Sequence, residues 1–190
     1  MKHGYRLVPA RDDDFEALMG LRWCAMRESM ADMGRIDPDH ARARMSRGFA
    51  PQHTHKILAD TINPLTGQPD LMGFVVVLPS EPGWIIDHLY IHPTGQRRGL
   101  GSWVLGQILE HADRRQRSVS VVALRHSAAV RFYERHGFVA TLQGEWDVHM
   151  QRAPRQPALA DGPEAVAVRP APLSRPAPAV VPDRQPALKR

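Results

Sequence analysis

The sequence has few of the features that mark secreted, membrane-bound or disulfide-stabilised proteins. Only one of its 190 residues is a cysteine, so no disulfide can form within the chain. This residue, Cys24, lies among Leu21, Met26 and Met30, and we predict a small buried thiol in a reducing compartment. No apolar run approaches the roughly 20 residues that span a bilayer, and the N-terminal residues lack the apolar core of a signal peptide. We therefore expect a cytoplasmic protein that does not use a membrane as a partner.

Basic blocks are also missing, although the net charge of the chain is +5. Residues 153–190 contain six basic and three acidic side chains, a net charge of +3, which leaves +2 for residues 1–152. A nearly balanced domain without a lysine- or arginine-rich block argues against nucleic acid as a partner. We expect no metal ion, and either a monomer or a homodimer.

Proline is unevenly distributed and indicates where the folded part ends. Nine of the 17 prolines lie after residue 152, in a segment that contains no aromatic residue. Such a segment cannot bury enough apolar surface to offset the entropy lost on ordering it. We predict one domain over residues 1–152 and a disordered tail over residues 153–190, with polyproline II character. The tail is either an inert extension or a proline-rich ligand.

Hydrophobic periodicity predicts an α/β domain in which strands and helices follow one another. A stripe of large apolar residues between Phe15 and Met30 recurs at steps of three and four, as on one buried face of a helix. Around the last helix, Ser127 is a candidate N-terminal cap and Gly137 fits the left-handed residue after the end. The expected strands span residues 5–8, 55–60, 71–78, 84–92, 118–124, 138–142 and 145–150, and the expected helices span residues 12–30, 38–47, 99–117 and 127–136.

The segment before the helix that begins near Gly99 has the residues of an anion site. It contains Gln-Arg-Arg-Gly-Leu-Gly over residues 96–101. A turn that leads into a helix N-terminus directs several backbone N–H groups the same way, and the helix dipole favours negative charge there. Gly99 and Gly101 leave room for a phosphate, and Arg97 and Arg98 add positive charge. Taken alone, the glycine pair is equally compatible with tight packing between strand and helix.

Two segments, in their order and spacing, resemble a known family. Residues 96–101 resemble the cofactor-binding motif of the GNAT N-acetyltransferase superfamily, Gln/Arg-x-x-Gly-x-Gly/Ala. About 30 residues later, residues 129–138 resemble its second motif, commonly Asn-x-x-Ala-x-x-Phe-Tyr-Glu-x-x-Gly-Phe. The specific motifs lie within residues 87–138, and the order of elements agrees over about residues 4–151. The tail is outside the resemblance.

The resemblance implies a fold, a co-substrate and a set of binding residues. The fold is a central twisted, mixed and mostly antiparallel sheet of about six to seven strands, with helices on both faces. The co-substrate is acetyl-CoA, whose pantetheine arm pairs with backbone groups of Leu89 and Ile91 and whose pyrophosphate is held by the amides of residues 97–102. The cofactor-binding residues implied in this way are Leu89, Tyr90, Ile91, Gln96, Arg97, Arg98, Gly99, Leu100, Gly101, Ser102, His126 and Ala129.

The resemblance also implies that Tyr133 protonates the departing coenzyme A thiolate. The residues agree with this, because His126, Ala129 and Tyr133 follow one another at steps of three and four and share one face of the predicted helix. His126 departs from the family, which usually has Asn there, but an imidazole can still donate one hydrogen bond. We assign the neighbouring Phe132 to the core.

The strand over residues 84–92 carries the candidate for acceptor chemistry. A primary amine arrives as a cation and must be neutral before it attacks the thioester. Asp87 is an acidic residue in an otherwise apolar strand, where an unpaired carboxylate is costly. It either holds the ammonium, accepts its proton or forms a structural salt bridge, with His88 as the alternative base. Simple alternation places Asp87 and Leu89 on one face of the strand, and Ile86 and His88 on the other.

These observations predict an enzyme that transfers the acetyl group of acetyl-CoA to a primary amine of a small molecule or protein by direct attack. Two alternatives stay open. An acetyltransferase toxin that acts on aminoacyl-tRNA would favour a strongly basic face, and a non-catalytic acyl-CoA-binding module would not need Tyr133. The segments expected to form the acceptor groove, about 28–40 and 143–147, match no motif, so the sequence does not identify the amine.

Overall fold

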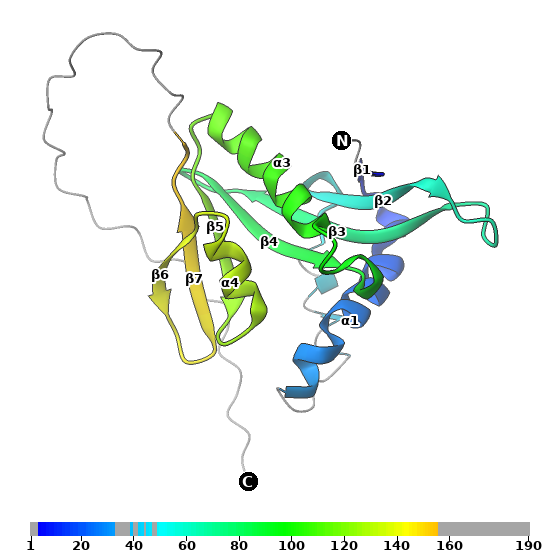
Figure 1. Cartoon of the computed structure of the whole chain (residues 1–190), viewed down its shortest axis with the longest axis horizontal. Helices are drawn as coiled ribbons and strands as arrows, with labels where there is room; N and C mark the ends of the chain where they lie inside the picture. The colour runs from blue at the N-terminus through cyan, green and yellow to red at the C-terminus, as the bar shows by residue number, and fades with distance from the viewer. Residues whose placement is uncertain (1–3, 33–38, 40–41, 44, 47–48, 156–190) are drawn as a thin grey trace, which may run out of the picture. The chain divides into compact units, whose positions relative to one another are not determined.

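One sheet forms the centre of the structure, a computed structural model that describes residues 4–32, 39, 42–43, 45–46 and 49–155 (Figure 1). Its seven described strands lie in the order β1-β2-β3-β4-β5-β7-β6, and all neighbours are antiparallel except β4 and β5. The predicted mixed, mostly antiparallel sheet is therefore confirmed. The strands are β1 (Tyr5–Pro9), β2 (Thr54–Ile62), β3 (Pro69–Pro79), β4 (Trp84–Ile91), β5 (Val119–Leu124), β6 (Val139–Gln143) and β7 (Asp147–Arg152).

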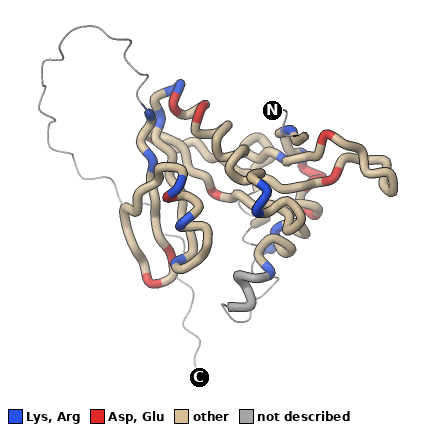
Figure 2. The backbone as a smooth tube through the Cα atoms, viewed as in Figure 1, with Lys and Arg blue, Asp and Glu red and all other residues tan. Residues whose placement is uncertain are grey.

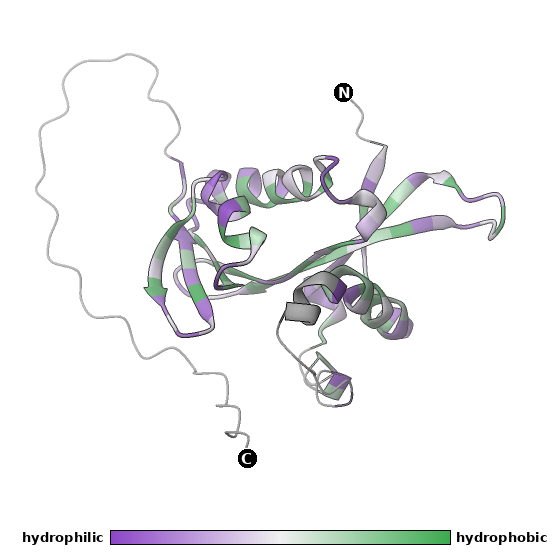
Figure 3. Ribbon diagram, turned by 60° about the horizontal axis from the view of Figure 1, so that its bottom comes forward, coloured by the Kyte–Doolittle hydropathy of each residue, from purple (hydrophilic) through white to green (hydrophobic). Residues whose placement is uncertain are grey.

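Helices cover both faces of the sheet, as the resemblance implied (Figure 3). On one face, α3 and α4 pack over a buried cluster that includes Ile57, Val75 and Val121. On the other face, α1 packs against Phe74 and Val76 of β3. The unbroken apolar run of β3 is thus explained, because its alternate residues enter two different cores. The helices are α1 (Phe15–Asp32), α3 (Leu100–Arg114) and α4 (Ala128–Glu134), with short 3-10 turns η1 (Asp12–Asp14), η2 (Pro51–His53) and η3 (Pro93–Gly95).

The apolar stripe of α1 faces the sheet as predicted, but its cysteine does not. Leu18 and Leu21 are buried, and Ala25 packs against the same cluster. Cys24 is exposed, so the prediction of a buried thiol is wrong. The inward face of α1 runs through Leu18, Leu21 and Ala25, and residue 24 lies beside that face rather than on it.

Several predictions concern residues outside the described structure. They include residues 33–37 of the turn expected at 31–37, whose first two residues belong to α1 instead, and most of the helix expected at 38–47. Only residues 153–155 of the expected tail are described, so its disorder and the domain boundary at residue 152 stay predictions. Among the helices that the structure describes, none is long and apolar enough to cross a membrane.

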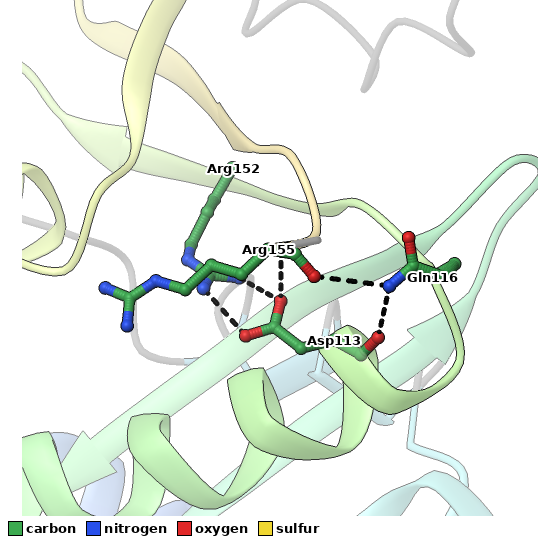
Figure 4. Close-up of polar contacts among 4 residues, drawn as sticks. All are labelled: Asp113, Gln116, Arg152 and Arg155. Atoms are coloured by element: carbon green, nitrogen blue, oxygen red, sulfur yellow. Dashed lines mark hydrogen bonds and ion pairs between the residues drawn. The ribbon is translucent and has the colours of Figure 1, made fainter. Parts of the chain in front are cut away.

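The end of β7 is tied to the end of α3 through one carboxylate (Figure 4). The buried guanidinium of Arg152 donates to both oxygens of Asp113, at 2.8 and 2.9 Å. The backbone N–H of Arg155 donates to Asp113 Oδ1 at 2.8 Å, and Gln116 Nε2 donates to the Arg155 carbonyl at 3.2 Å. Arg152, helped by the Arg155 amide, holds the pKa of Asp113 below its usual range. The network fixes residues 152–155 on α3.

Candidate functional site

The sheet opens between β4 and β5. Pairing of these parallel strands is confined to residues 84–86 of β4 and 119–121 of β5. Beyond this point β5 continues beside β7, whereas residues 87–91 of β4 have no strand on that side in the described chain. The two strands separate in Figure 1. An unpaired backbone edge is therefore exposed within the sheet, and an extended ligand can pair with it as an added strand.

The backbone groups of Leu89 and Ile91 point toward this opening. The N–H of His92 donates to the Met72 carbonyl at 2.8 Å and so faces β3. Because successive residues of a strand alternate between its two neighbours, the backbone groups of Tyr90 also face β3, and those of Leu89 and Ile91 face the open side. The residues predicted to pair with the pantetheine arm are thus on the available edge, where the Ile91 carbonyl also accepts from Gln96 Nε2, whereas the Tyr90 backbone is already used within the sheet.

The loop between β4 and α3 presents a set of unbonded amides. Arg97, with φ 58°, and Gly99, with φ 80°, both have left-handed backbone, a conformation that makes neighbouring N–H groups converge. In the described chain, no backbone carbonyl accepts a hydrogen bond from the amides of residues 97–102, and Trp103 is the first to donate, to Gly99 at 2.9 Å. These amides, together with the dipole of α3, fit the anion site predicted from the sequence.

The side chains of this loop have different surroundings. Gln96 Nε2 donates to the Ile91 carbonyl at 2.9 Å and fixes the start of the loop, a role that the motif did not reveal. A Cβ atom at Gly99 would meet no atom within 4 Å, whereas one at Gly101 would lie 3.6 Å from Phe132. Gly99 therefore borders open space, and Gly101 faces the packing between α3 and α4. Of the other predicted loop residues, the structure buries Leu100 and exposes Arg97, Arg98 and Ser102.

A β-bulge at Asp87 divides β4 into two registers. Consecutive residues of β3 pair with His88 and with Ile86, so Asp87 has no partner on β3. The extra residue shifts the alternation of side chains by one. Ile86 and Leu89 consequently share the face under α3 and α4, while His88 lies on the α1 face beside Tyr90. The predicted simple alternation is therefore wrong beyond Asp87.

The bulge brings the Asp87 carboxylate next to the His88 ring. Asp87 Oδ2 lies 3.4 Å from His88 Nε2, and the two side chains are 45% and 23% exposed. The His88 ring lies edge-on to Phe74, with 6.2 Å between centroids, and 5.5 Å from the Tyr90 ring. The guanidinium of Arg22, from α1, lies over Tyr90 at 5.9 Å from its centroid. A half-exposed carboxylate and a largely enclosed imidazole thus stand together at the bulge of β4.

Tyr133 is part of the core at α4. Its side chain is 6% exposed, and its ring packs against Phe132 and Phe138, with centroids 5.1 and 5.3 Å away. Burial, and to a lesser extent the nearby Tyr90, raise the pKa of the Tyr133 hydroxyl, so the group keeps its proton. Phe132 joins the same cluster, as predicted, and the role of Tyr133 as a proton donor stays a prediction.

His126 does not share a helical face with Ala129 and Tyr133. It lies in the turn before α4, has a left-handed backbone with φ 65°, and exposes its side chain. Ser127 occupies the N-cap position, but its hydroxyl donates to the Leu124 carbonyl at 2.7 Å and makes no capping bond to the helix. The predicted shared face is therefore wrong for His126, because the helix begins at residue 128.

Two features near the site were not predicted from the sequence. One is Arg22, which follows buried Leu18 by four residues; a charge on the apolar face of α1 was the available signal. The other is a groove between α1 and the β4–α3 loop. Its lining combines Trp23, Cys24, Ala25 and Arg27 with His92, Pro93 and Gln96.

Comparisons with known proteins agree with this geometry. Residues 64–140 match the family model described as an acetyltransferase (GNAT) domain. No curated protein sequence matches the chain. Among solved structures, the fold is similar to PaiA N-acetyltransferase from Thermoplasma acidophilum in complex with coenzyme A, with a TM-score of 0.60, 14% identity, and coverage of 78% of this chain and 98% of that one.

Two further solved structures show the same likeness. Ard1 from Thermoplasma volcanium has a TM-score of 0.57 and 17% identity, with coverage of 80% of this chain and 99% of its own. The ribosomal-protein-S18-alanine N-acetyltransferase from Escherichia coli has a TM-score of 0.56 and 14% identity, with coverage of 83% and 99%. At these identities the neighbours establish the fold and not the substrate.

Proposed function

We propose that this chain, whose residues 64–140 match a GNAT acetyltransferase domain, is an acetyl-CoA-dependent N-acetyltransferase that acts on a primary amine. One observation carries the proposal. The open edge of β4 at Leu89 and Ile91 leads directly to the unbonded amides of residues 97–102. An extended arm that ends in a pyrophosphate, as in coenzyme A, has the groups to pair with the first and to bind the second.

The chain's own residues then supply orientation and protons. Pairing along β4 would hold the thioester beside the bulge at Asp87, where the acceptor nitrogen must become neutral before it attacks. Attack forms the N–C bond and breaks the C–S bond by direct transfer. Tyr133, which keeps its proton because burial raises its pKa, would donate to the departing sulfur.

The acceptor is the open part of this proposal. The solved relatives include one named as a ribosomal-protein-S18-alanine N-acetyltransferase, so a peptide α-amine is a reasonable candidate beside small amines. The described domain offers little support for a tRNA acceptor, because residues 1–152 carry a net charge of only +2.

Cofactor binding is tested by thermal unfolding with added ligands. Acetyl-CoA should raise the melting temperature by mass action, about 2.7 kcal/mol of stabilisation at a hundredfold excess over Kd, while ATP and NAD should raise it far less. Dephospho-coenzyme A is a matched control: it should also raise the melting temperature, because it keeps the pyrophosphate and the pantetheine arm. A shift with NAD and none with acetyl-CoA would contradict the proposal.

Turnover is tested by thiol release from acetyl-CoA with a panel of amines: spermidine, glucosamine, glycine, and a peptide with a free N-terminal alanine. We expect thiol release that depends on one of these amines. A thermal shift with acetyl-CoA but no amine-dependent release with the panel or with aminoacyl-tRNA would favour the non-catalytic binding module. Release only with aminoacyl-tRNA would favour the toxin.

A further inference from the structure

The strand β4 places two titratable side chains together in a way that regular strand geometry would prevent. Adjacent residues of a regular strand point to opposite faces. The bulge removes this separation, and Asp87 Oδ2 lies 3.4 Å from His88 Nε2. Bulges that re-aim a side chain are frequent beside active sites. Here the bulge lies where the open edge of β4 begins.

The surroundings of the two side chains differ in a way that separates their roles. His88 is 23% exposed and packs between the rings of Phe74 and Tyr90. Asp87 is 45% exposed and has no cross-strand partner on β3. The other charged group described near this ring cluster is Arg22, whose guanidinium lies over Tyr90. The imidazole therefore has a fixed position, and the Asp87 carboxylate beside it can compensate a positive charge on the ring.

We propose that His88 removes the proton from the acceptor ammonium and that Asp87 is a positioning residue that acts through His88. The inference rests on the proposed acetyl transfer. The amine nitrogen loses two protons in that reaction. The first passes to the His88 imidazole before attack, and Asp87 stabilises the imidazolium until the proton leaves to solvent. The second is lost to solvent as the C–S bond breaks, and Tyr133, which has given its own proton to sulfur, regains a proton from solvent.

The test compares His88→Gln, Asp87→Asn and the double variant, with the panel amine that gives the highest turnover. His88→Gln should lower kcat/KM by roughly 10²–10⁴ and remove the acidic limb of the pH profile, with the acetyl-CoA thermal shift kept. Asp87→Asn should lower kcat/KM by a smaller factor and move the acidic limb to lower pH, because an unpaired imidazolium loses its proton more readily. The double variant should be no worse than His88→Gln, since the two residues act as one unit.

The chain offers a matched control in a second His–Asp pair. His149 Nε2 lies 4.0 Å from Asp147 Oδ1 on β7, and His149→Gln should leave the rate and the pH profile unchanged. Wild-type kinetics in His88→Gln would overturn the inference. The inference would also be overturned if the losses in kcat/KM multiplied in the double variant. The same holds if Asp87→Asn removed the acidic limb of the pH profile completely, or changed only the amine KM. A wild-type protein without amine-dependent turnover would instead contradict the proposed function.

Discussion

Tyr133 differs from a phenylalanine in the same core position by one hydroxyl group, and that hydroxyl is the proposed proton donor. Because its ring packs against Phe132 and Phe138, Tyr133→Phe should keep the fold and the binding of acetyl-CoA. Turnover should fall by roughly 10²–10⁴ if the hydroxyl is the acid. Burial raises the pKa of this hydroxyl, so the ratio of wild-type to variant turnover should be constant from weakly acidic to weakly alkaline pH.

Steady-state kinetics across this pH range check the Tyr133 prediction. Tyr5→Phe is the control, since Tyr5 packs against the same apolar cluster from β1, which is an edge strand of the sheet. Unchanged turnover in Tyr133→Phe would mean that water protonates the leaving thiolate.

Most of the sequence-based predictions that proved wrong concerned the position of single residues. The amide loop could be predicted because glycine and arginine identities are visible in the sequence. The bulge at Asp87 could not, because it depends on how β3 and β4 pair, and a one-residue shift moves every later side chain to the other face. His126 and Cys24 were misplaced for a related reason. His126 lies two residues before the helix to whose face it was assigned, and Cys24 lies one residue from Ala25 on the inward face of α1.

At the scale of elements, the β4–α3 loop allows two glycines to be tested against each other. Gly99 has φ 80° and borders open space, and asparagine tolerates this backbone. Gly99→Asn should therefore fold normally but place a side chain beside the amides of residues 97–102. We expect the acetyl-CoA KM to rise about tenfold or more, which corresponds to roughly 1.4 kcal/mol of binding.

Gly101→Ala is the matched control for this loop. Its Cβ would lie 3.6 Å from Phe132, an ordinary contact, and would point into the packing between α3 and α4. Its acetyl-CoA KM and melting temperature should stay close to wild type. Equal effects of the two substitutions on KM would show that the loop responds to any added side chain and not to a ligand beside Gly99.

Element types and their order were the most predictable features of the fold. All seven strands lie within a few residues of the predicted ranges, because period-two and period-three-to-four patterns follow directly from burial. The resemblance to the GNAT superfamily supplied the order of elements, and the described structure has that order. The acceptor groove could not be predicted in detail, because the segments expected to form it contain no periodic or motif signal.

Basic and acidic residues are spread along the described backbone and do not gather in one block (Figure 2). Among the described ion pairs, Arg152–Asp113 contains the most buried side chain: Arg152 is 5% exposed and Asp113 22%. This pair joins the last strand to the end of α3, two elements far apart in the chain. Its loss should therefore lower the stability of the whole domain and not only that of one helix.

Asp113→Asn tests this closure through the pH dependence of unfolding. Arg152 lowers the pKa of Asp113 in the folded state, so the unfolded chain takes up the proton at higher pH, near the ordinary value of about 3.9. The ion pair contributes fully above that pH and is lost as the pH falls through the lower, folded value. At neutral pH the variant should be less stable by about 3 kcal/mol, because it leaves a buried guanidinium without its charged partner.

Thermal unfolding from neutral pH to about pH 3 should show this gap in stability between wild type and variant narrowing below about pH 4. Glu110→Gln, which breaks the exposed Arg114 pair on the same helix, should change the melting temperature little at any pH. A gap that persists unchanged to the lowest pH would mean that packing and the hydrogen bonds to Arg155, and not the charge, hold β7 on α3.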